Sequence, residues 1–290
     1  MLLKAFAKVN LALAVDPPEP AGPRAGWHRI ASWMHAIDLA DDVEVVPADT
    51  GGITLDLSWA PDAPRPSPID WPPDRDLTVR AARALETELG RPIHVRIRLA
   101  KRIPTGGGLG GGSSDAAAVL RGLGSLLNLD SNVLLRAGAK VGSDVAFFLD
   151  EIGPTQPPRP ALVGGFGDEI KRLPACRDAL TLFLPAFGCA TPEVYRAFDA
   201  LGAPRSGRFH SDGIRAASAR SQVNETLLLN DLTPAAQRIA PELASLTSRL
   251  QQALGRPIHM SGSGSTLFAL GRHEPVGEIA TIACRLLGDA

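Results

Sequence analysis

The chain has 290 residues, with 30 lysines and arginines against 31 aspartates and glutamates, so its formal net charge is −1. This length fits one large domain or two of ordinary size. The balanced charge argues against a protein that holds nucleic acid or a membrane surface through bulk positive charge. A hydrophobic share of 44% excludes a disordered chain, and 29 glycines with 25 prolines predict many turns.

The cysteines and the N-terminus indicate where the protein works. Cys176, Cys189 and Cys284 are too far apart for a C-x-x-C pair, and a reducing cytoplasm suits them best. Lys8 and Asn10 interrupt the apolar start, and no clean cleavage site follows, so no signal peptide is expected. No run of about 18 apolar residues occurs, and we therefore expect no membrane span.

In the first half of the chain, alternation of apolar residues predicts strands and a 3.6-residue period predicts helices. The strands are expected at 2–15, 53–59 and 93–99. The helices are expected at 76–89, at about 114–127 and near 131–140. For the first of these, Asp76 is the expected N-cap and Gly90 the stop. Proline-rich stretches at 17–23, 61–73 and 154–160 predict surface loops.

A second set of elements begins near residue 179. Residues 153–167 are expected to form a linker or surface loop, and 179–186 an apolar strand. Helices are expected after Pro192 and near Pro234, then a strand at 257–260, a turn at 261–265, a strand at 266–270 and a terminal helix. Because strands and helices are intermingled, we predict an α+β fold with domains at 1–165 and 166–290.

The densest glycine cluster, PTGGGLGGGSSD, runs from Pro104 to Asp115 and leads into an alanine-rich helix. Glycines let backbone N–H groups approach a ligand closely, and a helix N-terminus attracts anions. Together these features predict a phosphate-binding loop. A flexible linker explains the cluster less well, because linkers do not lead from a strand straight into a helix.

Two other glycine motifs fit less well. Gly107 and Gly112 have the Walker A spacing, but Ser113 and Ser114 follow where that motif requires a lysine. The G-x-G-x-x-G pattern of dinucleotide-binding proteins also matches formally. The preceding strand, however, alternates apolar and charged residues, whereas a central parallel strand is apolar on both faces.

Three ordered motifs resemble those of the GHMP small-molecule kinases. They are AKVNL from Ala7, the glycine loop, and MSGSGS from Met260. The resemblance implies the GHMP kinase fold, with an N-terminal domain like domain 2 of ribosomal protein S5 and a ferredoxin-like C-terminal domain. It also implies that ATP binds to the residues of the loop, which are Pro104, Gly106, Gly107, Gly108, Leu109, Gly110, Gly111, Gly112, Ser113 and Ser114.

Shorter motifs resemble the branch of the family that phosphorylates a cytidine-diphosphate-linked methylerythritol in the non-mevalonate isoprenoid pathway. These motifs are GWH from Gly26, VGSDVAFF from Val141, TP-x-VY from Thr191 and NDL from Asn230. The resemblance implies that the substrate is bound by Asn10, Trp27, His28, Tyr195, Gly262 and Ser263. Trp27 stands where the family usually has tyrosine, so a hydroxyl contact would be lost.

Lys8 and Asp144 are implied to be catalytic. The resemblance makes Asp144 the base that takes the proton of the attacking hydroxyl, while Lys8 holds both groups. The alternatives are a solvated lysine on a strand and an aspartate that caps a helix. Asp115 replaces a frequent asparagine and would repel the phosphates of ATP unless Mg²⁺ intervenes.

The sequence thus predicts an ATP- and Mg²⁺-dependent kinase of a small molecule, with no nucleic-acid or membrane partner, as a monomer or homodimer. Two alternatives remain open. One is another GHMP kinase, of the homoserine or mevalonate type. The other is a catalytically inactive nucleotide-binding protein on the same fold. The motifs leave the ligands of Mg²⁺ undefined.

Overall fold

The computed structural model describes residues 1–202 and 209–288, and its contacts divide the chain into two compact units. Unit 1 comprises residues 1–7, 39–105 and 110–158, and unit 2 comprises residues 8–38, 106–109 and 159–290. Each unit therefore combines segments that are distant in sequence. The expected domain boundary after residue 165 stays a prediction, because compact contact groups do not test which segments fold independently.

Two long strands contribute to both units. Strand β1 covers Leu2–Pro18, and strand β2 covers His28–Pro47. The predicted strand at 2–15 is confirmed and is longer by three residues. Strand β2 was not predicted, because residues 33–37 are buried without interruption, and a run buried on both faces lacks the alternation that reveals a strand.

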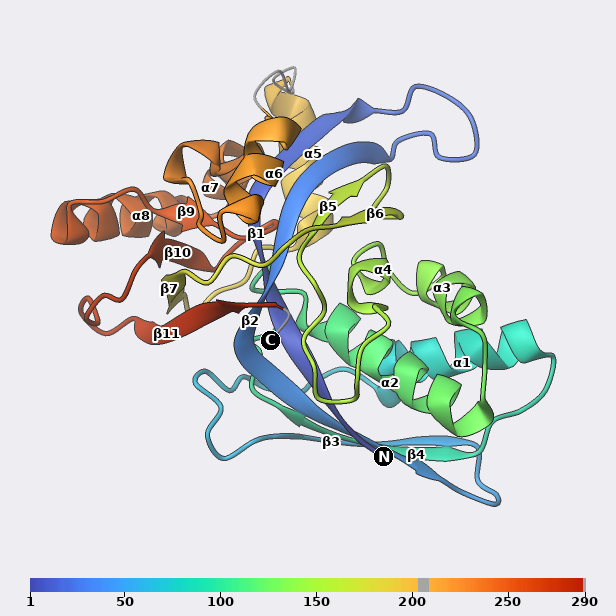
Figure 1. Cartoon of the computed structure of the whole chain (residues 1–290). Coiled ribbons are helices and arrows are strands. Elements are labelled where there is room, and N and C mark those ends of the chain that lie inside the picture. The colour runs from blue at the N-terminus through green and yellow to red at the C-terminus, as the bar shows by residue number, and fades with distance from the viewer. Residues whose placement is uncertain (203–208, 289–290) are drawn as a thin grey trace. The chain divides into compact units, whose positions relative to one another are not determined.

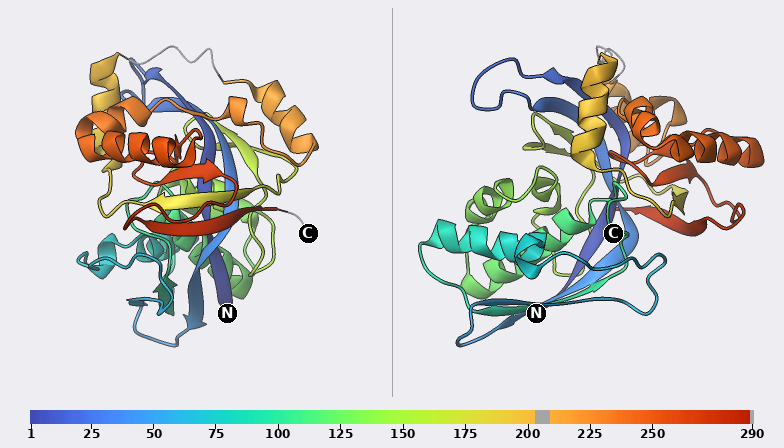
Figure 2. Two further views of the ribbon diagram at one scale, coloured as in Figure 1. Left: turned by 90° about the vertical axis from the view of Figure 1, so that its left-hand side faces the viewer. Right: turned by 180° about the vertical axis from the view of Figure 1, so that it is seen from behind.

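Unit 1 packs helices on one face of a sheet (Figures 1 and 2). Strand β3 is parallel to β4, and β4 is antiparallel to the end of β2. Alternate residues of β4 are buried beneath the helices, as its sequence predicts. The elements are β3 (Ile53–Trp59), η1 (Pro73–Arg75), α1 (Leu77–Leu89), β4 (Val95–Lys101), α2 (Gly111–Leu127), α3 (Ser131–Ala139) and α4 (Val145–Phe148).

Local end signals explain why the helix predictions in unit 1 succeed. The Asp76 side chain accepts a hydrogen bond of 2.9 Å from Thr78 N, and Gly90 ends α1 in the left-handed conformation. Asp130 accepts a bond of 2.7 Å from Asn132 N at the start of α3. Each side chain satisfies an N–H group that the first helical turn leaves unpaired.

Unit 2 contains an antiparallel sheet in the order β2-β11-β7-β10-β9. Helices α7 and α8 lie over one face of this sheet (Figure 2), and a core of α5, α7 and α8 side chains packs against β7 and β10. Its elements are β5 (Ala161–Gly164), β6 (Glu169–Arg172), β7 (Ala179–Leu184), α5 (Thr191–Leu201), α6 (Ser211–Ala219), η2 (Glu225–Leu227), β8 (Leu229–Asn230), α7 (Thr233–Ile239), α8 (Pro241–Leu254), β9 (His259–Met260), β10 (Leu267–Leu270) and β11 (Ala280–Leu287).

Two predictions in this part of the chain are wrong. The expected terminal helix is strand β11, which pairs with β7 along residues 280–285 and with β2 at residues 286–287. Residues 153–167, expected to be a loop, contain strand β5, which pairs with β2 and β6. In both cases partners distant in sequence supply the backbone hydrogen bonds, and single-sequence patterns do not contain that information.

Within the described residues, no helix combines the length and the apolar character that a membrane crossing requires.

Candidate active site

The glycine loop is held to the rest of unit 2 through its carbonyl groups. Gly107 O accepts from Thr266 N at 3.1 Å, and Leu109 O accepts from Lys8 N at 2.9 Å. Gly108 O accepts from Lys8 Nζ at 2.9 Å and from Ser261 Oγ at 3.0 Å. These bonds fix the carbonyl groups of the loop to the protein. A phosphate is bound by N–H donors, so carbonyl groups that are held in this way do not compete with it.

Gly108 packs against the C-terminal turn at 261–265. A Cβ atom at Gly108 would lie 2.2 Å from Ser261 O, and one at Gly262 would lie 2.9 Å from Gly108 O. Both residues have positive φ, +76° and +57°. Glycine at these two positions is therefore required by contact between two backbone turns, in addition to any approach of a ligand.

Gly108→Ala tests this packing, and Gly106→Ala is its matched control. Both glycines have similar left-handed φ values, +76° and +67°, but a Cβ at Gly106 meets only Gly188 Cα at 3.9 Å. We expect Gly106→Ala to lower the free energy of unfolding by about 1 kcal/mol, the cost of the backbone conformation. Gly108→Ala should cost about 3 kcal/mol or more, because a backbone must shift. Equal costs in denaturant titrations would contradict the assigned packing.

Helix α2 begins inside the glycine run, three residues earlier than expected. Gly110 is its N-cap in the left-handed conformation and provides no side-chain cap. A Cβ at Gly111 would lie 2.8 Å from Ile103 Cγ2, and one at Gly112 would lie 3.1 Å from Leu77 Cδ1. Glycine thus lets α2 start close to its neighbours in unit 1, with the amide groups of its first turn available to an anion.

Lys8 and Asn10 are buried in unit 2, with 3% and 2% of their surfaces exposed. Lys8 Nζ donates to Asn10 Oδ1, and Asn10 N donates to Ser261 Oγ at 3.2 Å. The hydroxyl of Ser261 in turn donates to Gly108 O. The three motifs that the sequence suggested are therefore joined by hydrogen bonds around Lys8. The alternative of a solvated lysine is wrong.

Asp144 lies in unit 1, at the N-cap position of α4. Its side chain forms no capping hydrogen bond with the amide groups of that helix, so far as the described residues show. The alternative of an aspartate retained as a helix cap is therefore not supported. Val145, Phe147 and Phe148, which follow Asp144, are buried and anchor this turn.

His28 and Tyr195 lie together in unit 2, whereas Trp27 points elsewhere. The rings of His28 and Tyr195 are 5.0 Å apart, and His28 Nε2 lies 3.4 Å from Asp199 Oδ1. Trp27 is 58% exposed and packs edge-on against Phe166, with the ring centres 6.4 Å apart. Of the three aromatic residues predicted to bind the base, His28 and Tyr195 are in contact with each other, whereas Trp27 packs separately.

The C-terminal turn is fixed by a residue whose role the sequence did not reveal. Asn230 Nδ2 donates to Met260 O and to Gly262 O, each at 2.8 Å. Ser263 Oγ is 2.8 Å from Thr191 Oγ1, at the start of α5. The asparagine of the NDL motif thus holds the start of the turn that carries Gly262 and Ser263.

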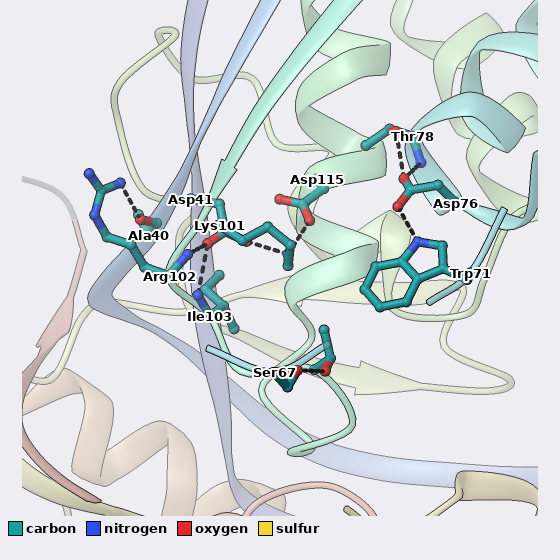
Figure 3. Close-up of polar contacts among 11 residues, drawn as sticks. Ala40, Asp41, Ser67, Trp71, Asp76, Thr78, Lys101, Arg102, Ile103 and Asp115 are labelled. Atoms are coloured by element: carbon teal, nitrogen blue, oxygen red, sulfur yellow. Dashed lines mark hydrogen bonds and ion pairs between the residues drawn. The ribbon is translucent and has the colours of Figure 1, made fainter. Parts of the chain in front are cut away.

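Asp115 faces a buried lysine, which the sequence did not anticipate (Figure 3). Lys101 Nζ donates to Asp115 Oδ2 and to Asp41 Oδ2, both at 2.6 Å, and all three residues are buried. The expected repulsion between Asp115 and phosphates is therefore replaced by an internal ion pair. Lys101 ends β4 and Asp115 lies in the second turn of α2, so this pair joins the two ends of the glycine loop within unit 1.

The electrostatics of this cluster follow from one cation between two carboxylates. Burial raises the pKa of Asp115 well above its usual value, and the opposing attraction of Lys101 does not overcome it, because Asp41 adds repulsion. Burial alone would lower the pKa of Lys101, but Asp115 and Asp41 outweigh it and raise that pKa. Asp115 Oδ1 has no hydrogen-bond partner among the described residues, whereas Asp41 Oδ1 accepts from Ile103 N at 2.8 Å.

The chain is similar to known proteins over most of its length. The GHMP kinases N terminal domain model matches residues 76–151. The 4-diphosphocytidyl-2-C-methyl-D-erythritol kinase of Desulfitobacterium hafniense (strain Y51) is 36% identical, covering 94% of this chain and 88% of that protein. The kinase of the same name from Carboxydothermus hydrogenoformans is 37% identical, covering 93% and 88%.

Solved structures show the same fold. A crystal structure of 4-(cytidine 5'-diphospho)-2C-methyl-D-erythritol kinase matches with a TM-score of 0.73 at 32% identity, covering 100% of both chains. A homoserine kinase from Cytophaga hutchinsonii matches with a TM-score of 0.61 at 16% identity, covering 98% of this chain and 96% of that one. At that identity the second match supports the fold alone.

Proposed function

The chain belongs to the family of 4-diphosphocytidyl-2-C-methyl-D-erythritol kinases within the GHMP kinases, and we propose that it transfers the γ-phosphoryl group of ATP to the 2-hydroxyl of that polyol. Its place is then in the biosynthesis of isoprenoid precursors. The glycine loop carries the proposal. Its carbonyl groups are held by Lys8, Ser261 and Thr266, while α2 begins with unpaired amide groups, an arrangement suited to the phosphates of ATP.

In the proposed reaction, the substrate oxygen attacks the γ-phosphorus and the bond from that phosphorus to the β–γ bridging oxygen breaks. ADP leaves, and the proton of the hydroxyl passes to the carboxylate of Asp144. Lys8, held by Asn10 Oδ1 and Gly108 O, supplies positive charge where negative charge develops. Positioning and charge neutralisation are the main requirements of phosphoryl transfer.

Mg²⁺ is proposed to accompany ATP as the counterion of its phosphates. Within residues 1–202 and 209–288, no group of three or more histidine, cysteine, aspartate or glutamate side chains is arranged to hold a metal ion. Magnesium is usually bound through few protein ligands together with phosphates and water. No side chain of this chain is therefore assigned to the ion.

For the cytidine, we propose that His28 and Tyr195 form the recognition pair. An aromatic face stacks on a base and is worth about 1–3 kcal/mol. His28 Nδ1 lies 2.8 Å from Asp16 O, so a backbone carbonyl fixes the ring. Trp27, Asn10, Gly262 and Ser263 remain proposed substrate contacts.

The cellular setting is also a proposal: a cytoplasmic enzyme, as a monomer or homodimer. Its support is that Cys176, Cys189 and Cys284 are unpaired and buried. Burial raises the pKa of the Cys176 thiol to about 12, so this group is a poor nucleophile at neutral pH. Such cysteines suit a reducing compartment.

An ADP-release assay with a panel of alcohols tests the proposed substrate. We expect turnover with the cytidine-diphosphate-linked methylerythritol and none above background with homoserine or mevalonate. The reverse pattern would place the chain in another branch of the family. Release of no ADP with any alcohol, from protein that still binds ATP, would identify a nucleotide-binding protein without catalysis.

A further inference from the structure

A chain of hydrogen bonds in unit 2 begins at a backbone carbonyl and ends at the Lys8 ammonium. Ser32 Oγ donates to Ala12 O at 2.8 Å, and Asn10 Nδ2 donates to Ser32 Oγ at 2.8 Å. Asn10 Oδ1 then accepts from Lys8 Nζ. Ser32, Asn10 and Lys8 expose 0%, 2% and 3% of their surfaces, so water does not compete for these bonds.

The direction of this chain is fixed at both ends. A carbonyl oxygen only accepts, so the single hydroxyl proton of Ser32 is committed to Ala12 O. A lone pair of Ser32 Oγ therefore accepts the hydrogen bond that Asn10 Nδ2 donates. A lysine ammonium only donates, so it requires the oxygen of that amide. Both neighbours therefore select the same one of the two orientations of the Asn10 amide.

We propose that Ser32 is a positioning residue for phosphoryl transfer, which sets the Asn10 amide orientation and thereby the place of the Lys8 ammonium. The inference rests on the proposed function, which assigns Lys8 to the reaction. Lys8 Nζ also donates to Gly108 O at 2.9 Å, so its position is coupled to the glycine loop. Ser32 lies on β2, four residues after His28, at a position outside every motif that the sequence analysis identified.

Loss of the Ser32 hydroxyl has a specific consequence. The Asn10 Nδ2 group would lose its buried acceptor, and the amide would gain by turning toward the Ala12 carbonyl or rotating altogether. A rotated amide presents N–H groups to the ammonium, which then loses an acceptor and is displaced. Loss of a hydrogen bond to a charged group at the site of reaction is expected to lower kcat about tenfold.

Ser32→Thr and Ser32→Val form the decisive pair, because threonine and valine have the same shape and differ by a hydroxyl in place of a methyl group. Any disturbance of packing affects both variants equally. In the ADP-release assay, we expect kcat of Ser32→Thr to exceed that of Ser32→Val about tenfold, with KM for ATP equal in the two. Equal kcat values, whether high or low, would overturn the proposal.

Thr181→Val is the matched control elsewhere in unit 2. Thr181 is buried, donates to Gly271 O at 2.9 Å and accepts from His273 N at 3.0 Å, so it loses the same kinds of bond. Its kcat should stay within about twofold of the wild-type value, as expected of a bond with a structural role only; a loss equal to that of Ser32→Val would overturn the proposal. Lys8→Met distinguishes a failure of the proposed function from a failure of the proposal for Ser32. If Lys8→Met retains wild-type turnover, the proposed catalytic role of Lys8 is wrong. If Ser32→Thr and Ser32→Val have equal kcat values while Lys8→Met is inactive, only the positioning role of Ser32 is wrong.

Discussion

Asp144→Asn is expected to lower kcat by a factor of about 10² to 10⁴, the usual contribution of a general base. Asparagine preserves the size and polarity of the side chain but does not accept the proton of the substrate hydroxyl. Asparagine is also able to form hydrogen bonds at this position, so we expect the free energy of unfolding to change much less than the activation free energy. Steady-state ADP release, with denaturant unfolding of the same preparation, measures both quantities.

Asp130→Asn is the matched control for this substitution. Asp130 is an exposed N-cap of α3 in the same unit, and asparagine caps helices about as well as aspartate does. Its kcat should equal that of the wild-type chain. Near-normal turnover of Asp144→Asn would remove Asp144 from the mechanism, even if KM for ATP rose.

Elements with local end signals could be predicted from the sequence. Asp76 and Gly90 mark both ends of α1, and alternation reveals β3 at its observed bounds. The glycine loop was also found, because its composition and its place between a strand and a helix are local features. The different roles of the individual glycines could not be predicted. Only the structure shows that Gly108 packs against Ser261 O, a contact across more than 150 residues of chain.

Contacts between distant segments account for what the sequence did not reveal. Asp41 and Lys101 are 60 residues apart, and nothing near either residue points to the other. Ser32 reaches Asn10 across the turn between two long strands, at a position that no motif marks. Lysine is scarce and occurs only at positions 4, 8, 101, 140 and 171, but scarcity alone does not single out Lys101.

Contacts with distant strands also explain why the C-terminal segment is a strand and not the predicted helix. Residues 280–287 contain alanine, leucine and arginine, which suit a helix, and the alternating burial of Cys284 and Leu286 is short. Pairing with β7 over six residues decides the conformation, because it supplies backbone hydrogen bonds to a segment whose Cys284 and Leu286 side chains are buried. Tertiary pairing therefore overrides a weak local preference.

Lys101→Met is expected to lower the free energy of unfolding by about 3–5 kcal/mol, the usual cost of removing one partner from a buried ion pair. Methionine fills much of the same volume but leaves Asp41 and Asp115 buried without their cation (Figure 3). Because the pair joins β4 to α2 across the glycine loop, we also expect KM for ATP to rise. Denaturant unfolding and steady-state kinetics measure the two effects.

Asp115→Asn separates the charge of the cluster from its packing. Asparagine still offers an oxygen to Lys101 and is uncharged, as the protonated carboxyl is, so stability below about pH 4 should change by only about 1 kcal/mol. In the wild-type chain the pKa of Asp115 is raised, so the folded state binds a proton that the unfolded state has released. The stability that this carboxyl contributes is complete below its usual pKa of about 3.8 and falls as pH rises through its higher folded pKa.

Asp115→Asn removes this dependence, so the stability of the variant relative to the wild-type chain should increase as pH rises above about 4. A relative stability that is constant with pH would show that Asp115 is ionised in both states. The cation of Lys101 would then be sufficient for both carboxylates, and the cost of Lys101→Met should exceed that of an ordinary buried pair, because two charges would lose their partner together.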